Sequence, residues 1–234
     1  MTDRTASDPA DLPFLPVEFD ATREALHLVA ARVLGAARYE AVGHMGLLVV
    51  PGGFGTPAFD GRRLLVVDGM LSDGEHRQPF TNLFDAYAFA GVDPAAPLHP
   101  ALDFPADRAA PLLVDTAAAT VLAGWFAFCQ SLLDSLLTGI GPADEPSAIT
   151  LWPEHFDLAL EMGPPGARAN YGGSPGDTAI DEPYLYVGPR DHRQGPFWNA
   201  GFGAALTYDE IRGGADPGAF FRQGQDLLAV LTRA

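Results

Sequence analysis

An uncharged, mostly apolar stretch at residues 116–133 limits the folds open to this chain more than any other feature. A segment of this length and composition forms either a membrane span or a helix buried in a protein core. The stretch contains Thr, Gly, Gln and Ser, lies between Asp115 and Asp134, and has no flanking Arg anchors. We therefore predict a buried core helix that Asp115 caps and Gly139 ends. Its apolar stripe would comprise Ala118, Val121, Leu122, Trp125, Phe128, Cys129, Leu132, Leu133 and Leu136.

The part of the chain before this stretch alternates between helical and strand patterns. After a loose lead-in at residues 1–19, Asp20 is a plausible N-cap for a helix. Residues 51–57 are rich in Gly and Pro and predict a turn, in which Gly53-Phe54-Gly55 lacks the following helix of a phosphate loop. The predicted inward face of the first helix is Leu26, Val29, Ala30, Val33, Leu34 and Ala37. Strands are predicted at 45–50, 63–67 and 70–78, with a turn at Asp68-Gly69 and a helix at 81–90 before Gly91.

The second part of the chain repeats this order of elements. Residues 92–111 are rich in Pro, Ala and Asp and predict a linker. Strands are predicted at 155–161 and 184–188, and Asp216-Pro217 opens a last helix. The inward residues of that helix would be Phe220, Phe221, Leu227, Leu228 and Leu231. We expect one α+β domain over residues 20–234, with helices covering one side of a largely antiparallel sheet. Two similar halves, 20–92 and 112–234, are an alternative within that domain.

Charge and cysteine content exclude several classes of partner. The net charge is −16 and the sequence contains no lysine, so we expect no binding to nucleic acid and none to anionic membrane surfaces. The single cysteine, Cys129, allows neither an intramolecular disulfide nor a thiolate metal site, and we expect it to be a buried, inert thiol. The acidic N-terminus is unlike a signal peptide, so we expect a cytoplasmic protein.

Residues 151–203 hold the most unusual side chains of the chain. Aromatic residues, carboxylates, a histidine and turn formers are far denser there than elsewhere. Aromatic rings with a few polar groups suit the wall of a ligand pocket, because rings supply apolar surface while polar groups orient the ligand. The candidate ligand-binding residues are Trp152, Tyr171, Asp177, Tyr184, Tyr186 and Trp198.

The strand predicted at 155–161 offers candidate catalytic residues. Alternation along a strand would place His155, Asp157 and Glu161 on one face and Glu154 on the other. A histidine beside a carboxylate is typical of a general base with its orienting partner, or of two metal ligands. A solvated polar face has the same pattern. The sequence has no HExxH motif, so we predict no metal site and keep His155, Asp157 and Glu154 as catalytic candidates.

Residues 163–183 show no clear pattern of helix or strand. Loops of this length are usually lids or binding loops, so Asn170, Tyr171 and Asp177 could fold over a ligand; a rigid surface loop is the alternative. Residues 172–176 match the G-x-S-x-G pattern of serine hydrolases. However, Pro175 follows the serine and has no backbone N–H for an oxyanion hole, which argues against a hydrolase elbow.

The motifs LWPEHFDLA (151–159), NYG (170–172) and EPYLYVGP (182–189) resemble those of an uncharacterised family of actinobacterial hypothetical proteins. The resemblance covers most of the chain after the first twenty residues. It implies a bacterial cytosolic protein and a single recurring unit, and it implies no activity, cofactor or catalytic residue.

The sequence is compatible with three functions. The first is small-molecule binding through a pocket lined by residues 151–203. The second is a hydrolase or isomerase, with or without a metal, that uses His155 with Asp157 or Glu154. The third is a homodimeric interaction module anchored by Tyr184, Tyr186 and Trp198. The sequence favours them in that order and specifies no cofactor.

Overall fold

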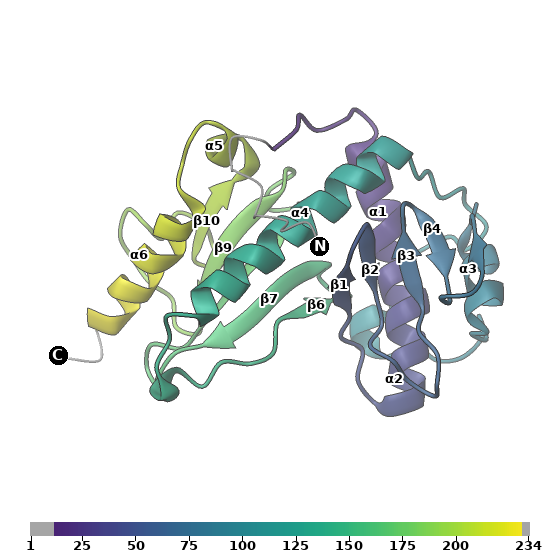
Figure 1. Cartoon of the computed structure of the whole chain (residues 1–234), viewed down its shortest axis with the longest axis horizontal. Helices are drawn as coiled ribbons and strands as arrows, with labels where there is room; N and C mark the ends of the chain where they lie inside the picture. Colours follow the sequence, from purple (N-terminus) through teal and green to yellow (C-terminus); the bar gives the residue numbers. More distant parts are fainter. Residues whose placement is uncertain (1–11, 231–234) are drawn as a thin grey trace, which may run out of the picture. The chain divides into compact units, whose positions relative to one another are not determined.

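The computed structural model describes residues 12–230 and has the α+β architecture that the sequence predicts (Figure 1). Its strands form two antiparallel sheets of five strands each. The chain divides into two compact units. Of the described residues, unit 1 comprises 12–13, 128–149 and 157–230, and unit 2 comprises 14–127 and 150–156. This division differs from the halves 20–92 and 112–234, because the predicted linker at 92–111 lies entirely within unit 2.

Unit 2 begins with one long helical segment. It consists of α1 (Phe19–Val29), a π-helical stretch η2 (Ala30–Gly35) and α2 (Ala36–Val42). All six residues of the predicted inward face are buried. The predicted N-cap was wrong: α1 begins at Phe19, so Asp20 lies in the first turn, where a carboxylate favours the positive end of the helix.

A meander of five short strands follows in unit 2. These are β1 (Leu48–Val50), β2 (Gly53–Gly55), β3 (Leu65–Val67), β4 (Met70–Ser72) and β5 (Arg77–Gln78), paired antiparallel in chain order. The predicted turn at 51–57 was wrong over β2. A Cβ at Gly53 would overlap the carbonyl oxygen of Val66 on the neighbouring strand, so this glycine marks a close backbone approach. The turn at Asp68-Gly69 is confirmed, with positive φ at both residues.

Helix α3 and a long connection held by Arg32 follow in unit 2. The predicted helix is confirmed as α3 (Leu83–Ala90), with Asn82 as its N-cap and Gly91 in the left-handed conformation at its end. The connection that follows contains only a 3₁₀ turn, η3 (Pro100–Leu102). Arg32 of the π-helical stretch is buried and donates to the Phe104 carbonyl oxygen and, at 3.1 Å, to Asp103 Oδ1.

The uncharged stretch forms α4 (Thr116–Leu137). Asp115 caps it as predicted, because its Oδ1 accepts a hydrogen bond of 2.9 Å from the Ala118 backbone N–H. Trp125 and Cys129 are buried, and burial raises the pKa of the Cys129 thiol. Within the described part of the chain, α4 alone is long and apolar enough to cross a membrane, judged by length and composition only; half of its most apolar window is buried inside the protein.

The sheet of unit 1 contains four strands of that unit in meander order. They are β7 (Asp157–Met162), β8 (Ala169–Ser174), β9 (Tyr184–Pro189) and β10 (Ala204–Thr207), each antiparallel to the next. The short strand β6 (Thr150–Trp152) lies in unit 2, where Leu151 bridges to Leu47. Unit 1 also holds the 3₁₀ turn η4 (Pro142–Asp144) and the helices α5 (Tyr208–Arg212) and α6 (Pro217–Val230).

Strand β8 corrects the expectation of a structureless loop at 163–183. Its glycines look like turn formers in the sequence, yet both lie at crowded points of the sheet. A Cβ at Gly172 would lie 2.6 Å from the Leu158 carbonyl oxygen, and a Cβ at Gly173 would overlap the sulfur of Cys129. Only glycine fits at these two positions, because neighbouring atoms occupy the space of a side chain. Residues 169–174 therefore form a central strand and not a loop.

The two faces of the unit 1 sheet differ sharply. One face, which we call the helix face, carries the apolar residues Leu158, Leu160, Met162, Tyr171, Leu185 and Val187. Helices cover it: Cys129 of α4 lies against Gly173, and the Tyr171 ring is 6.0 Å from that of Phe221 in α6. The opposite polar face carries Asp157, Glu161, Ser174, Tyr184 and Tyr186. Helices therefore cover one side of this sheet, as predicted.

Helix α6 begins as the sequence predicts. Asp216 caps it through a 3.0 Å bond from the Ala219 backbone N–H, and Phe220, Phe221 and Leu228 are buried. Leu227 is 38% exposed and was wrongly assigned to the inward face, since it lies one residue before the buried Leu228 and so about 100° around the helix. Leu231 lies outside the described residues.

Candidate functional site

The polar face of the unit 1 sheet is organised around Asp157 and Tyr186. Asp157 is the first residue of β7, and its Oδ2 accepts a short hydrogen bond from the Tyr186 hydroxyl. Tyr186 belongs to β9, with β8 between the two strands. Its ring reaches across because it passes over Gly172, where a Cβ would lie 2.8 Å from both Cζ and Oη of Tyr186. The glycine of β8 is therefore a requirement for the Asp157–Tyr186 bond.

A second phenol–carboxylate bond lies beside the first. The Tyr184 hydroxyl donates to Asp177 Oδ2 at 2.6 Å. The other oxygen of Asp177 accepts backbone N–H bonds from Ala179 at 2.7 Å and Ile180 at 3.1 Å, so this carboxylate also closes the turn after β8. Burial raises the pKa of both Tyr184 and Tyr186, and the negative charges of Asp177 and Asp157 raise it further. Both phenols therefore remain protonated donors at neutral pH.

Three aromatic rings gather at this place. Phe202, in the turn before β10, stacks on Tyr184 with ring centroids 5.7 Å apart, and its centroid is 6.1 Å from that of Tyr186. The two tyrosine rings are 6.2 Å apart. Phe202 is 38% exposed, whereas Tyr184 is only 4% exposed. The cluster thus stiffens the edge of the sheet next to β10 and leaves part of one ring open to solvent.

A groove runs along the outer edge of β10, and we call it the β10 groove. Its volume is about 410 Å³, which lies in the range typical of small-molecule sites. Its principal lining residues are Phe197, Asn199, Ala205, Glu210, Asp216 and Phe220. All of them belong to unit 1, and Ala205 is the cross-strand partner of Tyr186. The groove therefore adjoins the polar face on which Tyr184 and Tyr186 lie.

The wall of the β10 groove contains fixed polar and aromatic groups. The Asn199 side chain donates to the Ala205 carbonyl oxygen at 3.0 Å and accepts from the Ala205 backbone N–H at 2.8 Å. The Phe197 and Phe220 rings lie 5.3 Å apart with an interplanar angle of 36°. Among the described residues, no Arg, Lys or His lines this groove, whereas Glu210 and Asp216 both do.

The edge of β10 is already hydrogen-bonded. The Asn199 amide pairs with Ala205 as a neighbouring strand would, and Glu210 Oε2 accepts from the Thr207 backbone N–H at 2.8 Å. At the start of the strand, Ala200 and Gly203 exchange backbone bonds of 2.9 and 3.1 Å. These bonds occupy the groups that an added strand would need, so the edge is closed to strand pairing.

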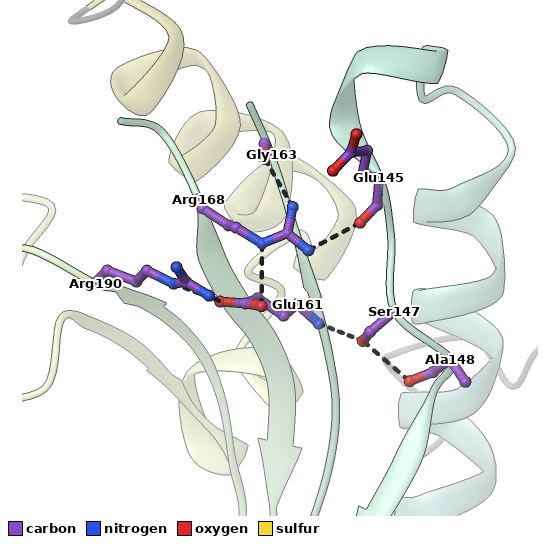
Figure 2. Close-up of polar contacts among 7 residues, drawn as sticks. All are labelled: Glu145, Ser147, Ala148, Glu161, Gly163, Arg168 and Arg190. Carbon is purple, nitrogen blue, oxygen red and sulfur yellow. Dashed lines mark hydrogen bonds and ion pairs between the residues drawn. The ribbon is translucent and has the colours of Figure 1, made fainter. Parts of the chain in front are cut away.

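Ion pairs hold the other end of the polar face (Figure 2). Glu161 pairs with Arg168 at 3.0 Å and with Arg190 at 2.6 Å. Arg168 also donates to the carbonyl oxygens of Gly163 at 3.1 Å and Glu145 at 2.9 Å. Partial burial acts to raise the pKa of Glu161, but the bonds from the two arginines outweigh it and the net pKa is lowered. The cluster ties the connections around β7 and β8 to the sheet.

Several predicted site residues come together, and others do not. Asp157, Asp177, Tyr184 and Tyr186 share the polar face. Tyr171 is 2% exposed and packs against α6 on the helix face, so it lies on the opposite side of the sheet from Tyr184 and Tyr186. Trp198 lies next to the groove, with its ring 4.9 Å from that of Phe197, but it is not a lining residue.

Trp152, Glu154 and His155 belong to unit 2, in and after β6. The prediction of a strand from 155 was wrong at its start, because β7 begins at Asp157 and His155 is an exposed residue of the preceding turn. Phe156 has a φ of 57°, which breaks the extended backbone, and its Phe ring is anchored in the unit 2 core. Alternation therefore does not place His155 beside Asp157. The Trp152 ring lies 5.9 Å from that of His44.

No pattern in the sequence indicated that His27 stabilises the turn at residues 153–156. Its Nε2 donates to the Pro153 carbonyl oxygen at 3.0 Å, and its ring stacks on Phe156 with centroids 5.2 Å apart. Burial lowers the pKa of His27 to about 4, so the ring is neutral at physiological pH. A lone histidine on a helical face carries no sequence signal for such a role. Among the described residues, no three His, Cys, Asp or Glu side chains form a group that could hold a metal ion.

No family model, no curated protein and no solved structure matches this chain.

Proposed function

We propose that this protein binds a small organic molecule in the β10 groove. The observation that carries the proposal is the groove itself: about 410 Å³ in volume, with two phenylalanine rings and a positioned side-chain amide in its wall. Small-molecule sites combine apolar surface with a few oriented polar groups in this way. Phe197 and Asn199 come from the aromatic-rich stretch 151–203, and the opposite wall comes from α5 and α6.

The groove wall is preorganised, which supports binding. Asn199 is held by two bonds to Ala205, and the rings of Tyr184, Tyr186 and Phe202 brace the strand from the polar face. A wall that is ordered before the ligand arrives loses less conformational entropy on binding. In this proposal Tyr184, Tyr186, Asp157 and Asp177 support the groove and do not themselves line it.

The other two functions have weaker support. For an enzyme, the Asp157–Tyr186 bond is an unusual buried carboxylate–phenol pair, but His155 lies outside the strand that carries Asp157. For a homodimer, Tyr184 offers little surface because it is 4% exposed, and the β10 edge is closed to strand pairing. We therefore place ligand binding first, in a cytoplasmic protein.

The test blocks the groove with a side chain. Ala219 is an exposed residue of α6 that lines the groove, so Ala219→Trp should fill it without disturbing the core. Leu227→Trp, on the same helix but outside the lining, is the matched control. Native mass spectrometry and ligand-observed NMR with a library of small aromatic and amine fragments would compare the three proteins.

The expected result is that fragments bind the wild type and Leu227→Trp and are lost from Ala219→Trp, with unchanged thermal stability. Absence of any bound fragment, or binding that survives Ala219→Trp, would contradict the proposal.

A further inference from the structure

We infer that the ligand of the β10 groove is an organic cation, a small amine with an apolar or aromatic body. This inference rests on the proposed function and adds the chemical class of the ligand. It is carried by the side chains that line the groove. The carboxylates favour a positively charged group, and the aromatic rings favour an apolar body joined to it.

The charged groups of the lining are both acidic. Glu210 and Asp216 contribute carboxylates, and no basic side chain of the described residues lines the groove. Both carboxylates are held in place by capping bonds, since Glu210 Oε2 accepts from Thr207 N–H at 2.8 Å and Asp216 Oδ1 accepts from Ala219 N–H at 3.0 Å. Each carboxylate has a second oxygen beyond its capping bond, and a carboxylate accepts several hydrogen bonds at once. An ammonium group supplies the matching donors.

The basic side chain of Arg222 lies near Asp216. Arg222 Nη2 is 3.5 Å from Asp216 Oδ2, but both side chains are 64% exposed and Arg222 does not line the groove. An exposed ion pair at this distance is weak. The groove therefore keeps a negative charge despite this ion pair. An anionic ligand would be repelled by two carboxylates, with no basic side chain among the described lining residues to offset them.

The aromatic side chains complete the match. The Phe197 and Phe220 rings lie 5.3 Å apart and form part of the apolar wall, on which the body of an amine can pack. The negative faces of aromatic rings also attract cations. The net charge of −16 acts at longer range, because it raises the local concentration of cations near the surface.

The experiment uses three probes of similar size that differ in charge: 2-phenylethylamine, 2-phenylethanol and 3-phenylpropionate. We expect the amine to bind the wild type roughly tenfold more tightly than the alcohol, and the carboxylate to bind most weakly. The preference for the amine should shrink as salt is added, since the ion pairs with the lining are partly exposed. Titration calorimetry or ligand-observed NMR gives the three dissociation constants.

Two variants test the carboxylates without removing the caps. Glu210→Gln and Asp216→Asn keep a side-chain oxygen that can accept the capping bond. Each should reduce the preference for the amine over the alcohol about threefold or more. Asp209→Asn and Asp226→Asn are matched controls, because they remove the same charge from α5 and α6 at positions outside the lining.

The outcomes separate the two proposals. The inference of a cationic ligand is overturned if the amine and the alcohol bind equally, or if the lining and control variants change the preference for the amine equally. Either result leaves the groove as a binding site. Failure of all three probes to bind, or binding that persists in Ala219→Trp, overturns the proposed function itself.

Discussion

The two units use their buried polar side chains in different ways. In unit 2, Arg32 donates to the Phe104 carbonyl oxygen and His27 to that of Pro153, so side chains of one helical segment hold the backbone of distant connections. In unit 1, Tyr186 bonds to Asp157 and Tyr184 to Asp177, so side chains of the sheet bond to other side chains. The side-chain bonds of unit 2 hold irregular backbone against a helix. The side-chain pairs of unit 1 lie beside the β10 groove.

This difference suggests a division of roles. Bonds from a side chain to a distant carbonyl oxygen satisfy backbone that has no partner in a helix or sheet, and they contribute mainly to stability. The phenol–carboxylate bonds of unit 1 join one side chain to another, so their arrangement can serve a neighbouring site. Changes in unit 2 should therefore lower the free energy of unfolding most, and changes near the groove should affect binding more than stability.

The largest expected effect is in the core of unit 2. Phe156 is 1% exposed, and its ring contacts those of His27, Phe54 and Phe126. Phe156→Ala should lower the free energy of unfolding by about 3–5 kcal/mol, because it leaves a cavity and removes the ring stacked on His27. Denaturant titration measures this, with Phe84→Ala, at a position 48% exposed, as a control that should cost less than about 1 kcal/mol. Similar losses in both variants would contradict the assignment of Phe156 as an anchor.

A pH dependence of stability should follow from His27. Its pKa is about 4 in the folded protein, against 6.5 for an ordinary histidine, so the unfolded chain binds the proton more tightly. Stability should therefore fall as the pH drops from about 6.5 to about 4, by up to about 3 kcal/mol, and this contribution should level off below that range. His27→Asn should remove this slope in urea titrations, whereas His192→Asn, at an exposed position, should leave it. An unchanged slope in His27→Asn would show that another group titrates.

An intermediate effect is expected for the phenol–carboxylate bonds of unit 1. Tyr186→Phe removes the hydroxyl that donates to the buried Asp157 and should cost about 1–3 kcal/mol. Tyr184→Phe should cost less, about 1 kcal/mol, because Asp177 is exposed and keeps its backbone bonds. Chemical denaturation at neutral pH compares the two variants. Equal losses of stability in the two variants would show that the burial of Asp157 does not strengthen the contribution of its bond to Tyr186.

The smallest effect is expected for Arg190. Its side chain is 66% exposed and pairs, within the described part of the chain, with Glu161 only, so Arg190→Ala should cost about 0–1 kcal/mol. Arg168→Ala should cost more, about 1–3 kcal/mol, since Arg168 also donates to the carbonyl oxygens of Gly163 and Glu145 (Figure 2). Thermal denaturation at low and high salt would compare them. A larger loss of stability in Arg190→Ala than in Arg168→Ala would contradict the idea that side-chain bonds to backbone carbonyl oxygens contribute most to stability. The comparison of the two units depends on that idea.

Local patterns in the sequence predicted most helices and several strands. The apolar stripe of the first helix, the Asp115 cap and the Asp68-Gly69 turn all depend on neighbours within four residues, which a sequence displays directly. The strand β8 and the start of β7 were misassigned for the opposite reason. Gly172 and Gly173 are required by contacts with Tyr186 and Cys129. The turn before Asp157 is anchored because the Phe156 ring packs against His27, Phe54 and Phe126. These partners are far away in the chain.

The candidate site shows the same limit. Asp157, Asp177, Tyr184 and Tyr186 were chosen for their residue types, and the pairing of the strands then brought them to one face. The lining residues Ala205, Glu210, Asp216 and Phe220 had no distinguishing signal in the sequence. Glu210 belongs to an ordinary capping box, Asp216 caps a helix, and Phe220 is a core aromatic residue. Their role depends on the closeness of the 196–199 segment to α6, which no local periodicity encodes.

By itself the sequence determined that this chain has a buried apolar helix, antiparallel strands and a large net negative charge. Composition and short-range periodicity are enough for these, because burial of one face and net charge are properties of local segments. Only the tertiary structure decided that Tyr186 reaches Asp157 over Gly172, that Tyr171 faces the helices, and that Asn199 closes the β10 edge beside a groove. Strand register and the packing of distant segments set these contacts, and a shift by one residue would send each side chain to the other face.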